Sequence, residues 1–149
     1  MARWAIPPAA ALELHDIMVD AIAWDNANTA EQPMSETAIS KRVRLEAANL
    51  GCHTWRNNSG AMRTRDGRFV RFGLGNESAA INAVMKTLDL IGIGPAGRFL
   101  AIEVKKPGWR YTGTARELAQ SNFMRTVRGA GGVAFFASSV EDVKRGLMA

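Results

Sequence analysis

Two short segments of the chain place an acidic residue inside an otherwise apolar run. Residues 88–93 contain Asp89, and residues 99–105 contain Glu103, followed two positions later by Lys105. Because side chains alternate between the faces of an extended strand, this pattern predicts β-strands, with Glu103 and Lys105 on one face of the second strand. The opposite face of that strand then carries Leu100, Ile102 and Val104.

Helical spacing of apolar residues marks two segments in the first third of the chain. The apolar positions of the first segment are Leu14, Ile17, Met18 and Ala21. A polar, small-residue-rich stretch over residues 25–34 follows, which we interpret as a linker. The second helix is predicted to begin after the N-cap Ser35 and to end near Leu50, before Gly51. These patterns divide the chain into an N-terminal helix and linker, residues 1–34, and a domain over residues 35–149.

Strand-like segments follow the second helix. We predict strands over residues 52–57 and 68–73, separated by polar turn residues that include Asp66-Gly67. Residues 75–87 fit either a short helix or a loop, and the two acidic strands come next.

The C-terminal third is predicted to alternate helix, strand and helix. Thr114 and Glu117 form a capping box for a helix that runs to about Arg128. Residues 133–137 have the composition of a buried strand, and residues 139–147 that of a closing helix. The order of all these elements predicts the α/β class, with a mixed central β-sheet flanked by α-helices and an extra N-terminal helix.

Composition excludes several classes of protein. The chain has 149 residues, enough for one hydrophobic core, and no apolar run approaches the roughly 20 residues needed to span a bilayer. We therefore expect no membrane partner. Cys52 is the single cysteine, so an intrachain disulfide is excluded and a cytoplasmic location is expected. With His15 and His53 as the only histidines, a four-ligand structural zinc site is excluded as well.

The charge of the chain is unevenly distributed. Residues 1–35 contain one basic and five acidic residues, whereas residues 41–71 contain eight basic and two acidic residues, within a net charge of +5. A one-sided basic segment indicates a polyanionic partner, nucleic acid first. A basic face that only interacts with solvent would produce the same pattern, and the charge alone does not decide between them.

The two acidic strands also suggest a chemistry. If Asp89 and Glu103 lie side by side in a sheet, their carboxylates repel each other, and a divalent cation between them is the simplest relief. Such an arrangement, with Lys105 nearby, suits the hydrolysis of a phosphodiester. A surface ion pair between Glu103 and Lys105 on an edge strand is the alternative.

Several features occur in an order that is typical of one nuclease family. They are Glu36 at a helix start, Asp89 in a Leu-Asp-Leu-Ile-Gly turn, Glu103-Val104-Lys105, and Gln120 in the following helix. Over about residues 35–147 the chain resembles the VRR-NUC domain, a branch of the PD-(D/E)xK nuclease superfamily whose core is restriction-endonuclease-like. One departure is Leu88, where the family usually has proline; we expect it to change the geometry of the turn rather than the chemistry. Residues 74–88 are a second departure.

The resemblance implies roles for these residues. Its metal ligands are Asp89, Glu103, the backbone carbonyl of Val104, and Glu36 directly or through water, around Mg²⁺ or Mn²⁺. Glu46 is the alternative to Glu36, and the number of ions stays open. Lys105 would orient or help to deprotonate the attacking water, and Gln120 would hydrogen-bond to the lysine or the water.

The resemblance further implies a metal-dependent DNA endonuclease of a bacterial cell or a phage-infected host cell. We expect branched or junction DNA as the substrate, and a homodimer as the active form. An inactive nucleic-acid-binding module of the same fold, and a nuclease acting on RNA or on linear ends, are the alternatives. The residues expected to contact nucleic acid are Arg56, Asn57, Asn58, Ser59, Arg63, Arg65, Arg68, Arg71, Lys106, Trp109 and Arg110.

Overall fold

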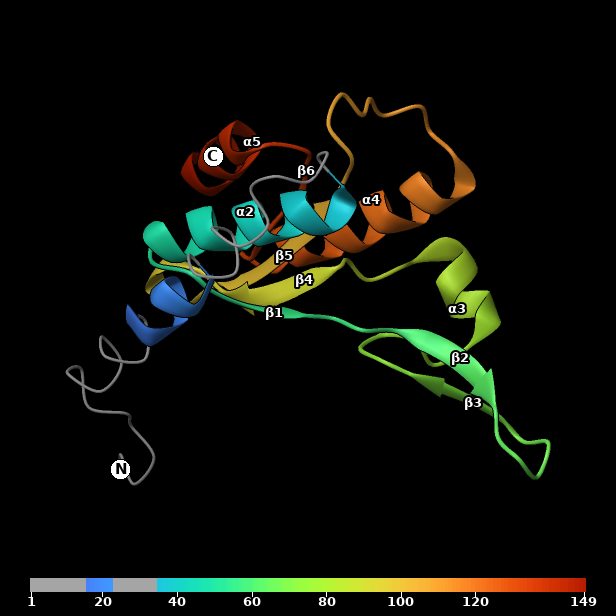
Figure 1. The fold of residues 1–149 in the computed structure, drawn as a ribbon. Helices are drawn as coiled ribbons and strands as arrows, with labels where there is room; N and C mark the ends of the chain where they lie inside the picture. Colours follow the sequence, from blue (N-terminus) through green and yellow to red (C-terminus); the bar gives the residue numbers. More distant parts are fainter. Residues whose placement is uncertain (1–15, 23–34) are drawn as a thin grey trace, which may run out of the picture.

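The computed structural model describes residues 16–22 and 35–149. Its centre is a four-stranded sheet in the order β1-β4-β5-β6 (Figure 1). The strands are β1 (His53–Arg56), β4 (Leu90–Ile93), β5 (Phe99–Val104) and β6 (Val133–Ala137). β1, β4 and β5 pair antiparallel, whereas β5 and β6 pair parallel. The protein is therefore a mixed α/β fold, as the sequence predicts.

Three helices cover the two faces of the sheet. α2 (Glu36–Asn49) and α5 (Val140–Met148) contact each other and pack on one face, and α4 (Ala115–Gly129) packs on the other. The predicted alternation along β5 is confirmed: Leu100 and Ile102 belong to the core on the α2 side, and Ala101 to the core on the α4 side. Each face of the central strand is thus buried against a helix.

The predicted helix starts are confirmed by their caps. The Ser35 hydroxyl accepts a hydrogen bond from the Ala38 N–H at 3.2 Å. Thr114 and Glu117 form the reciprocal capping box of α4, and Ser139 caps α5. Residues 75–87, for which the sequence left a helix or a loop open, contain the short helix α3 (Ala79–Val84). A 3₁₀ turn (Pro95–Gly97) joins β4 to β5.

The prediction for residues 52–73 was wrong in one respect. The region holds three strands rather than two. β2 (Gly60–Arg63) was not predicted and pairs antiparallel with β3 (Phe69–Phe72), whereas β1 pairs with β4. The sequence of β2 is short and starts with glycine, so it carries little strand propensity of its own. Its strand conformation comes from pairing with β3, which sequence pattern does not reveal.

The β2–β3 hairpin projects from the sheet beyond the end of β1 (Figure 1). Cross-strand partners share a face, and successive pairs alternate, so the hairpin has two distinct faces. Arg63, Phe69 and Arg71 form the basic face; Met62, Val70 and Phe72 form the apolar face. All three apolar side chains are exposed, Met62 at 56%.

Part of the predicted N-terminal helix is described. Residues 16–22 are helical, and the Met18 sulfur lies 3.4 Å from His53 Nδ1 in β1. Leu14 and the predicted linker over residues 25–34 lie outside the described residues, as does the boundary at residue 34. In the part of the chain that the structure describes, every helix is too short or too polar to traverse a bilayer.

Candidate active site

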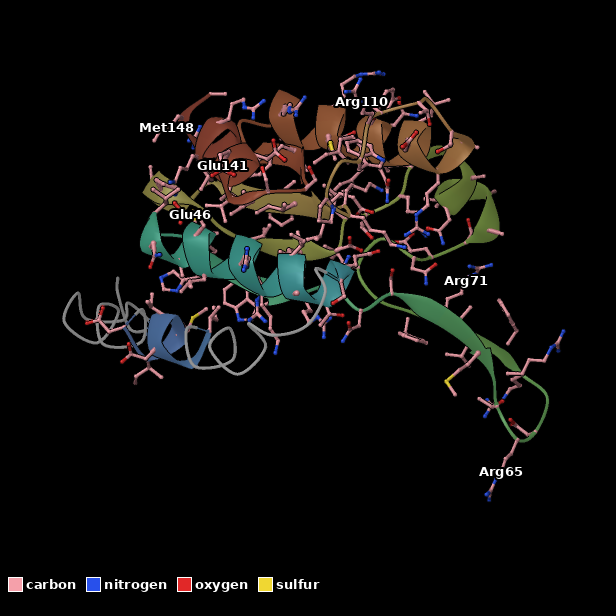
Figure 2. All side chains as sticks on the ribbon, turned by 45° about the horizontal axis from the view of Figure 1, so that its top comes forward. Glu46, Arg65, Arg71, Arg110, Glu141 and Met148 are labelled. Carbon is pink, nitrogen blue, oxygen red and sulfur yellow. The ribbon has the colours of Figure 1, made fainter. Side chains whose placement is uncertain are left out.

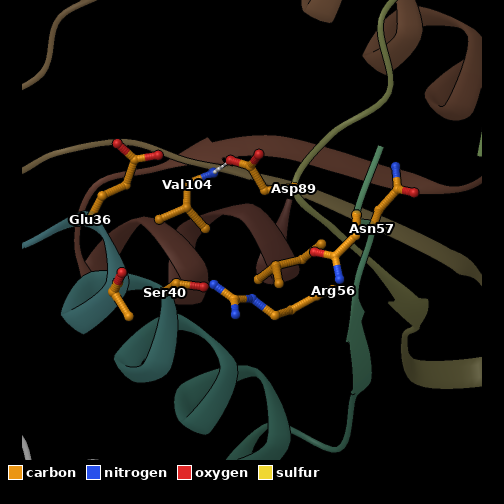
Figure 3. A pocket seen from close by; sticks show the side chains of 9 residues that line it. Glu36, Ser40, Arg56, Asn57, Asp89 and Val104 are labelled. Atoms are coloured by element: carbon orange, nitrogen blue, oxygen red, sulfur yellow. Dashed lines mark hydrogen bonds between the residues drawn. The ribbon is translucent and has the colours of Figure 1, made fainter. Parts of the chain in front are cut away.

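Asp89 and Glu103 meet where β4 begins and β5 ends. The register pairs Leu90 with Ile102, which places Asp89 and Glu103 as the next neighbours across the two strands. The Asp89 N–H donates to Glu103 Oε2 at 3.2 Å, and the Val104 N–H donates to Asp89 Oδ2 at 3.1 Å (Figure 3). The antiparallel register therefore brings together the two carboxylates that sequence reasoning singled out.

The backbone changes direction at Asp89. Leu88 packs in the core on the α4 side, whereas Leu90 packs in the core on the α2 side, although a regular strand would place both on one face. Asn57, directly after β1, fixes this turn. Its N–H donates to the Asp89 carbonyl at 2.8 Å, and its side-chain amide donates to the Leu88 carbonyl at 3.0 Å.

Glu103 is the centre of a buried polar cluster. The residue is only 2% exposed, and its Oε1 accepts hydrogen bonds from Lys105 Nζ, at 3.1 Å, and from the Gln120 amide. Lys105 also donates to Gln120 Oε1 at 3.1 Å. The three side chains thus form a closed ring of contacts between β5 and α4, and the expected contact of Gln120 with the lysine is present.

The electrostatics of this cluster favour a bound cation. Burial, reinforced by the negative charge of Asp89, raises the pKa of Glu103 to about 7, against the opposing effect of Lys105. A divalent ion beside both carboxylates would stabilise the ionised form and offset their repulsion. Both carboxylates offer oxygen ligands, the type that Mg²⁺ and Mn²⁺ prefer, and Val104 lines both cavities beside them.

A third carboxylate does not complete the cluster. Within residues 16–22 and 35–149, no three His, Cys, Asp or Glu side chains converge closely enough to hold a metal ion together. Glu36 is exposed at the start of α2, yet it lines cavities shared with Asp89 and with Glu103. Glu46 instead forms an ion pair with Lys144 of α5 at 3.7 Å. Of the two candidates, Glu36 is the one that faces the site.

Two adjoining cavities surround the carboxylates. The first, of about 210 Å³, opens between α2, the end of β1 and Asp89 (Figure 3). Its lining residues are Glu36, Thr37, Ser40, Arg56, Asn57, Asn58, Asp89, Leu90 and Val104. The second is lined by Glu36, Glu103, Val104, Lys105, Lys106, Trp109 and Arg116. Both share Glu36 and Val104, so a ligand at the carboxylates contacts α2, β5 and α4 at once.

Sequence reasoning missed Ser40 and Arg116 among these lining residues. Ser40 lies one helical turn after Glu36, so once Glu36 is placed at the site, the i,i+4 spacing identifies it. Arg116 stands in the first turn of α4, beside Glu103, whose carboxylate its charge favours. The capping box in the sequence places Arg116 in the first turn of α4, and residues of a first helical turn lie beside whatever the start of the helix faces.

The residues expected to contact nucleic acid lie in several parts of the structure. Arg56 and Asn58 line the cavity beside Asp89, and Lys106 lines the cavity beside Glu103. Arg63 and Arg71 lie on the basic face of the hairpin, with their guanidinium carbons 6.0 and 5.1 Å from the Phe69 ring centroid.

Several further candidates line neither cavity. Arg65 stands at the tip of the hairpin (Figure 2), and Arg68 pairs with Asp66 at 2.7 Å. Ser59 is exposed where the chain enters β2, and Arg110 is exposed in the loop after β5. A ligand that reaches both the cavities and the hairpin tip must be long.

Two of the candidates have mainly structural contacts. The Asn57 side chain holds the Asp89 turn and also accepts a hydrogen bond from the Leu74 N–H at 3.2 Å. The Trp109 ring packs on Phe136, with centroids 4.8 Å apart, and its N–H donates to Glu117. Both side chains also line the cavities beside the carboxylates, Asn57 the one at Asp89 and Trp109 the one at Glu103, so their contact with nucleic acid stays a prediction.

No protein-family model, curated protein or solved structure matches this chain, so its membership of the VRR-NUC family stays a prediction.

Proposed function

We propose that the protein is a divalent-metal-dependent nuclease with a restriction-endonuclease-like core, hydrolysing phosphodiester bonds of DNA. The observation that carries this proposal is the juxtaposition of Asp89, Glu103 and Lys105. Burial and the charge of Asp89 raise the pKa of Glu103, and a lysine ammonium lies beside it in a cavity lined by further cations. This arrangement suits a metal-bound phosphate.

The side chains of the site have distinct roles in such a reaction. Asp89, Glu103 and the Val104 carbonyl would hold Mg²⁺ or Mn²⁺, which supplies an activated water and charge neutralisation at the phosphate. Lys105, held by Glu103 and Gln120, presents its ammonium to the attacking water or to the oxygens of the phosphate. Arg116 lines the same cavity and would add positive charge near the phosphate oxygens, on which negative charge develops during hydrolysis.

The basic residues outside the site suggest how a long polyanion would bind. Arg56 stands at the cavity beside Asp89, and from there the chain leads into the hairpin with Arg63 and Arg71 on one face. Guanidinium groups bind phosphate oxygens and fix the position of a duplex without reading its sequence. We propose DNA, with branched or junction forms preferred, as the ligand that follows this path.

The test is a cleavage assay with the purified full chain. Labelled linear, nicked and four-way-junction DNA, and an RNA of equal length, are incubated with Mg²⁺, Mn²⁺ or EDTA. We expect metal-dependent cleavage of DNA that is lost in Glu103→Ala and Lys105→Ala and kept in Glu46→Gln, whose carboxylate pairs with Lys144 away from the site. Tight binding without cleavage under any metal would overturn the proposal in favour of an inactive module, and cleavage of RNA alone would overturn DNA as the substrate.

We also propose that the protein acts as a homodimer through the apolar face of the hairpin. An isolated two-stranded hairpin is marginally stable in water, and this one exposes Met62, Val70 and Phe72 together. A second copy would bury them while leaving the basic face free. Light scattering should report twice the chain mass for the parent protein and the chain mass for Val70→Glu; a monomeric parent would contradict this.

A further inference from the structure

Aromatic rings enclose the lysine of the proposed site. Lys105 Nζ lies 5.5 Å from the ring centroid of Trp109 and 5.4 Å from that of Phe136. Oxygens of Glu103 and Gln120 each lie 3.1 Å from the same nitrogen, and the lysine side chain is 14% exposed. A lysine has a long, flexible side chain, so four neighbours are what confine this ammonium to one place.

Trp109 itself needs support, because it lies in the segment between β5 and α4, which has no regular secondary structure. Its indole N–H donates to Glu117 Oε1 at 2.9 Å. The other oxygen of Glu117 accepts from the Thr112 N–H and hydroxyl, both at 3.2 Å, and from the Thr114 N–H at 2.9 Å. One buried carboxylate therefore ties the loop to the first turn of α4.

Glu117 is suited to this role by its charge state. The backbone N–H of Thr114, with further hydrogen bonds from Thr112 and Trp109, lowers the pKa of Glu117 to about 2. The carboxylate stays ionised at any pH at which a nuclease works, and an ionised carboxylate only accepts hydrogen bonds. Its position in the first turn of a helix favours the negative charge as well.

The same helix thus reaches Lys105 by two routes. Gln120 bonds directly to the ammonium, and Glu117, one turn earlier, reaches it through the indole ring. We infer that Glu117 and Trp109 are positioning residues for Lys105, holding its ammonium against Glu103 at the place where the phosphate reacts. The expected effect on cleavage rests on the proposed function, whereas the contact between Trp109 and Lys105 is present in the protein without a ligand.

The inference assigns Trp109 differently from base stacking. A ring that stacks on a base contributes to affinity, so its loss weakens DNA binding. A ring that positions a reacting group contributes to the rate, and displacement of such a group by about 1 Å can cost about 10²-fold. Separating the two requires measuring binding and cleavage on the same variants.

The experiment compares Trp109→Leu, Trp109→Phe and the control Phe99→Leu. Phenylalanine at position 109 keeps a ring face for the ammonium but lacks the indole N–H that bonds to Glu117. Phe99 is an exposed ring at the opposite end of β5 from Glu103, whereas the Tyr111 ring packs on Trp109 and Phe136 and is unsuitable as a control. Single-turnover cleavage is measured with Mg²⁺, and the Kd for DNA with EDTA. The NMR resonances of the Lys105 side chain in the metal-free protein report whether aromatic rings still lie beside it.

We expect Trp109→Leu to lower the cleavage rate constant by about 10²-fold with little change in Kd, and to reduce the upfield ring-current shift of the Lys105 side chain to the part that Phe136 supplies. Trp109→Phe should recover only part of both, because the ring face returns without the bond to Glu117, and Phe99→Leu should match the parent. An unchanged rate and unchanged Lys105 resonances in folded Trp109→Leu would overturn the inference, as would a weakened Kd with a normal rate. If the parent cleaves no nucleic acid, the proposed function fails, whereas the NMR comparison still decides the contact.

Discussion

The cluster around Glu103 and the β2–β3 hairpin are built in opposite ways. In the cluster, buried charges are almost fully matched: Glu103, Lys105 and Gln120 bond to one another, and Glu117 accepts hydrogen bonds on both oxygens. In the hairpin, apolar and basic side chains are exposed, and Phe69 remains 56% accessible. The cluster is satisfied within the chain, whereas the apolar side chains of the hairpin are left uncovered by the residues that the structure describes.

Under the proposed function, this difference would separate chemistry from recognition. A buried, hydrogen-bonded cluster holds its groups in one arrangement, as a reacting centre requires. An exposed hairpin with one basic and one apolar face contributes little to the fold and offers area to a polyanion and to a protein surface. Changes in the cluster should therefore alter rate and stability, and changes in the hairpin should alter binding and assembly.

The largest effect is expected for Glu103→Gln. The variant keeps the shape of the side chain but lacks the charge needed to hold a cation, so metal-dependent cleavage should fall by about 10³-fold or more. Quenched time courses on labelled junction DNA measure the rate, and Glu46→Gln is the matched control on α2. Cleavage of Glu103→Gln at the parent rate would show that the chemistry lies elsewhere.

Stability should depend on pH through the same residue. The pKa of Glu103 is raised from 4.5 to about 7, so between these values the folded state binds more protons than the unfolded state. The free energy of unfolding therefore falls as pH rises from about 5 to above 7, by up to about 3 kcal/mol. Urea unfolding in EDTA at pH 5 and pH 8 measures this fall.

Two comparisons sharpen the pH prediction. Glu103→Gln should show a smaller fall in stability than the parent, because it has no carboxylate to ionise at this position. Added Mg²⁺ should stabilise the parent at pH 8 more than at pH 5, since a ligand carboxylate must be deprotonated to bind the ion. Identical pH profiles of the free energy of unfolding for the parent and Glu103→Gln would contradict the assignment of Glu103 as a buried carboxylate with a raised pKa.

A moderate effect is expected on the basic face of the hairpin. The double variant Arg63→Ala, Arg71→Ala removes two guanidinium groups and should weaken DNA binding by about tenfold or more, with the salt dependence of log Kd reduced by about two. Fluorescence anisotropy across a salt series measures both. The double variant Lys144→Ala, Arg145→Ala on α5 removes the same amount of charge away from the hairpin and is the control. Equal losses of binding in both double variants would mean that net charge alone matters.

The smallest effect is expected at Met62 on the hairpin, in contrast to a core residue. Leu100→Ala opens a cavity in the core and should cost about 2–5 kcal/mol of unfolding free energy, whereas Met62→Ala on the hairpin should stay within about 0.5 kcal/mol in the monomer. Chemical denaturation at a concentration where the protein is monomeric compares them. A large cost at Met62 would show that the hairpin packs within its own chain.

The sequence predicted the cluster better than the hairpin, for a physical reason. Acidic residues in apolar strands leave few arrangements that avoid a buried unpaired charge, so Glu103 and Lys105 could be placed on one face from alternation alone. The capping box at Thr114 and Glu117 also has a sequence signature. Strand β2 has no such signature, because its pairing with β3 decides its conformation.

Side-chain partners formed by non-local contacts were also beyond the sequence. Asn57 lines the cavity beside Asp89 and also holds the turn at Asp89, because β1 pairs with β4. Trp109 lines the cavity beside Glu103, and its ring packs on Phe136, which is far along the chain. The pairing of β1 with β4 and of β5 with β6 brings these partners together, and spacing in the sequence does not specify either pairing.

The central claim is that Asp89 and Glu103 share one divalent ion. Binding of Mn²⁺ to the metal-free full chain, followed by electron paramagnetic resonance and calorimetry at pH 8, tests it without any substrate. The account predicts a site in the parent and in Glu46→Gln that is lost in both Asp89→Asn and Glu103→Gln. Equal Mn²⁺ binding by all four proteins, or none by the parent, would contradict it.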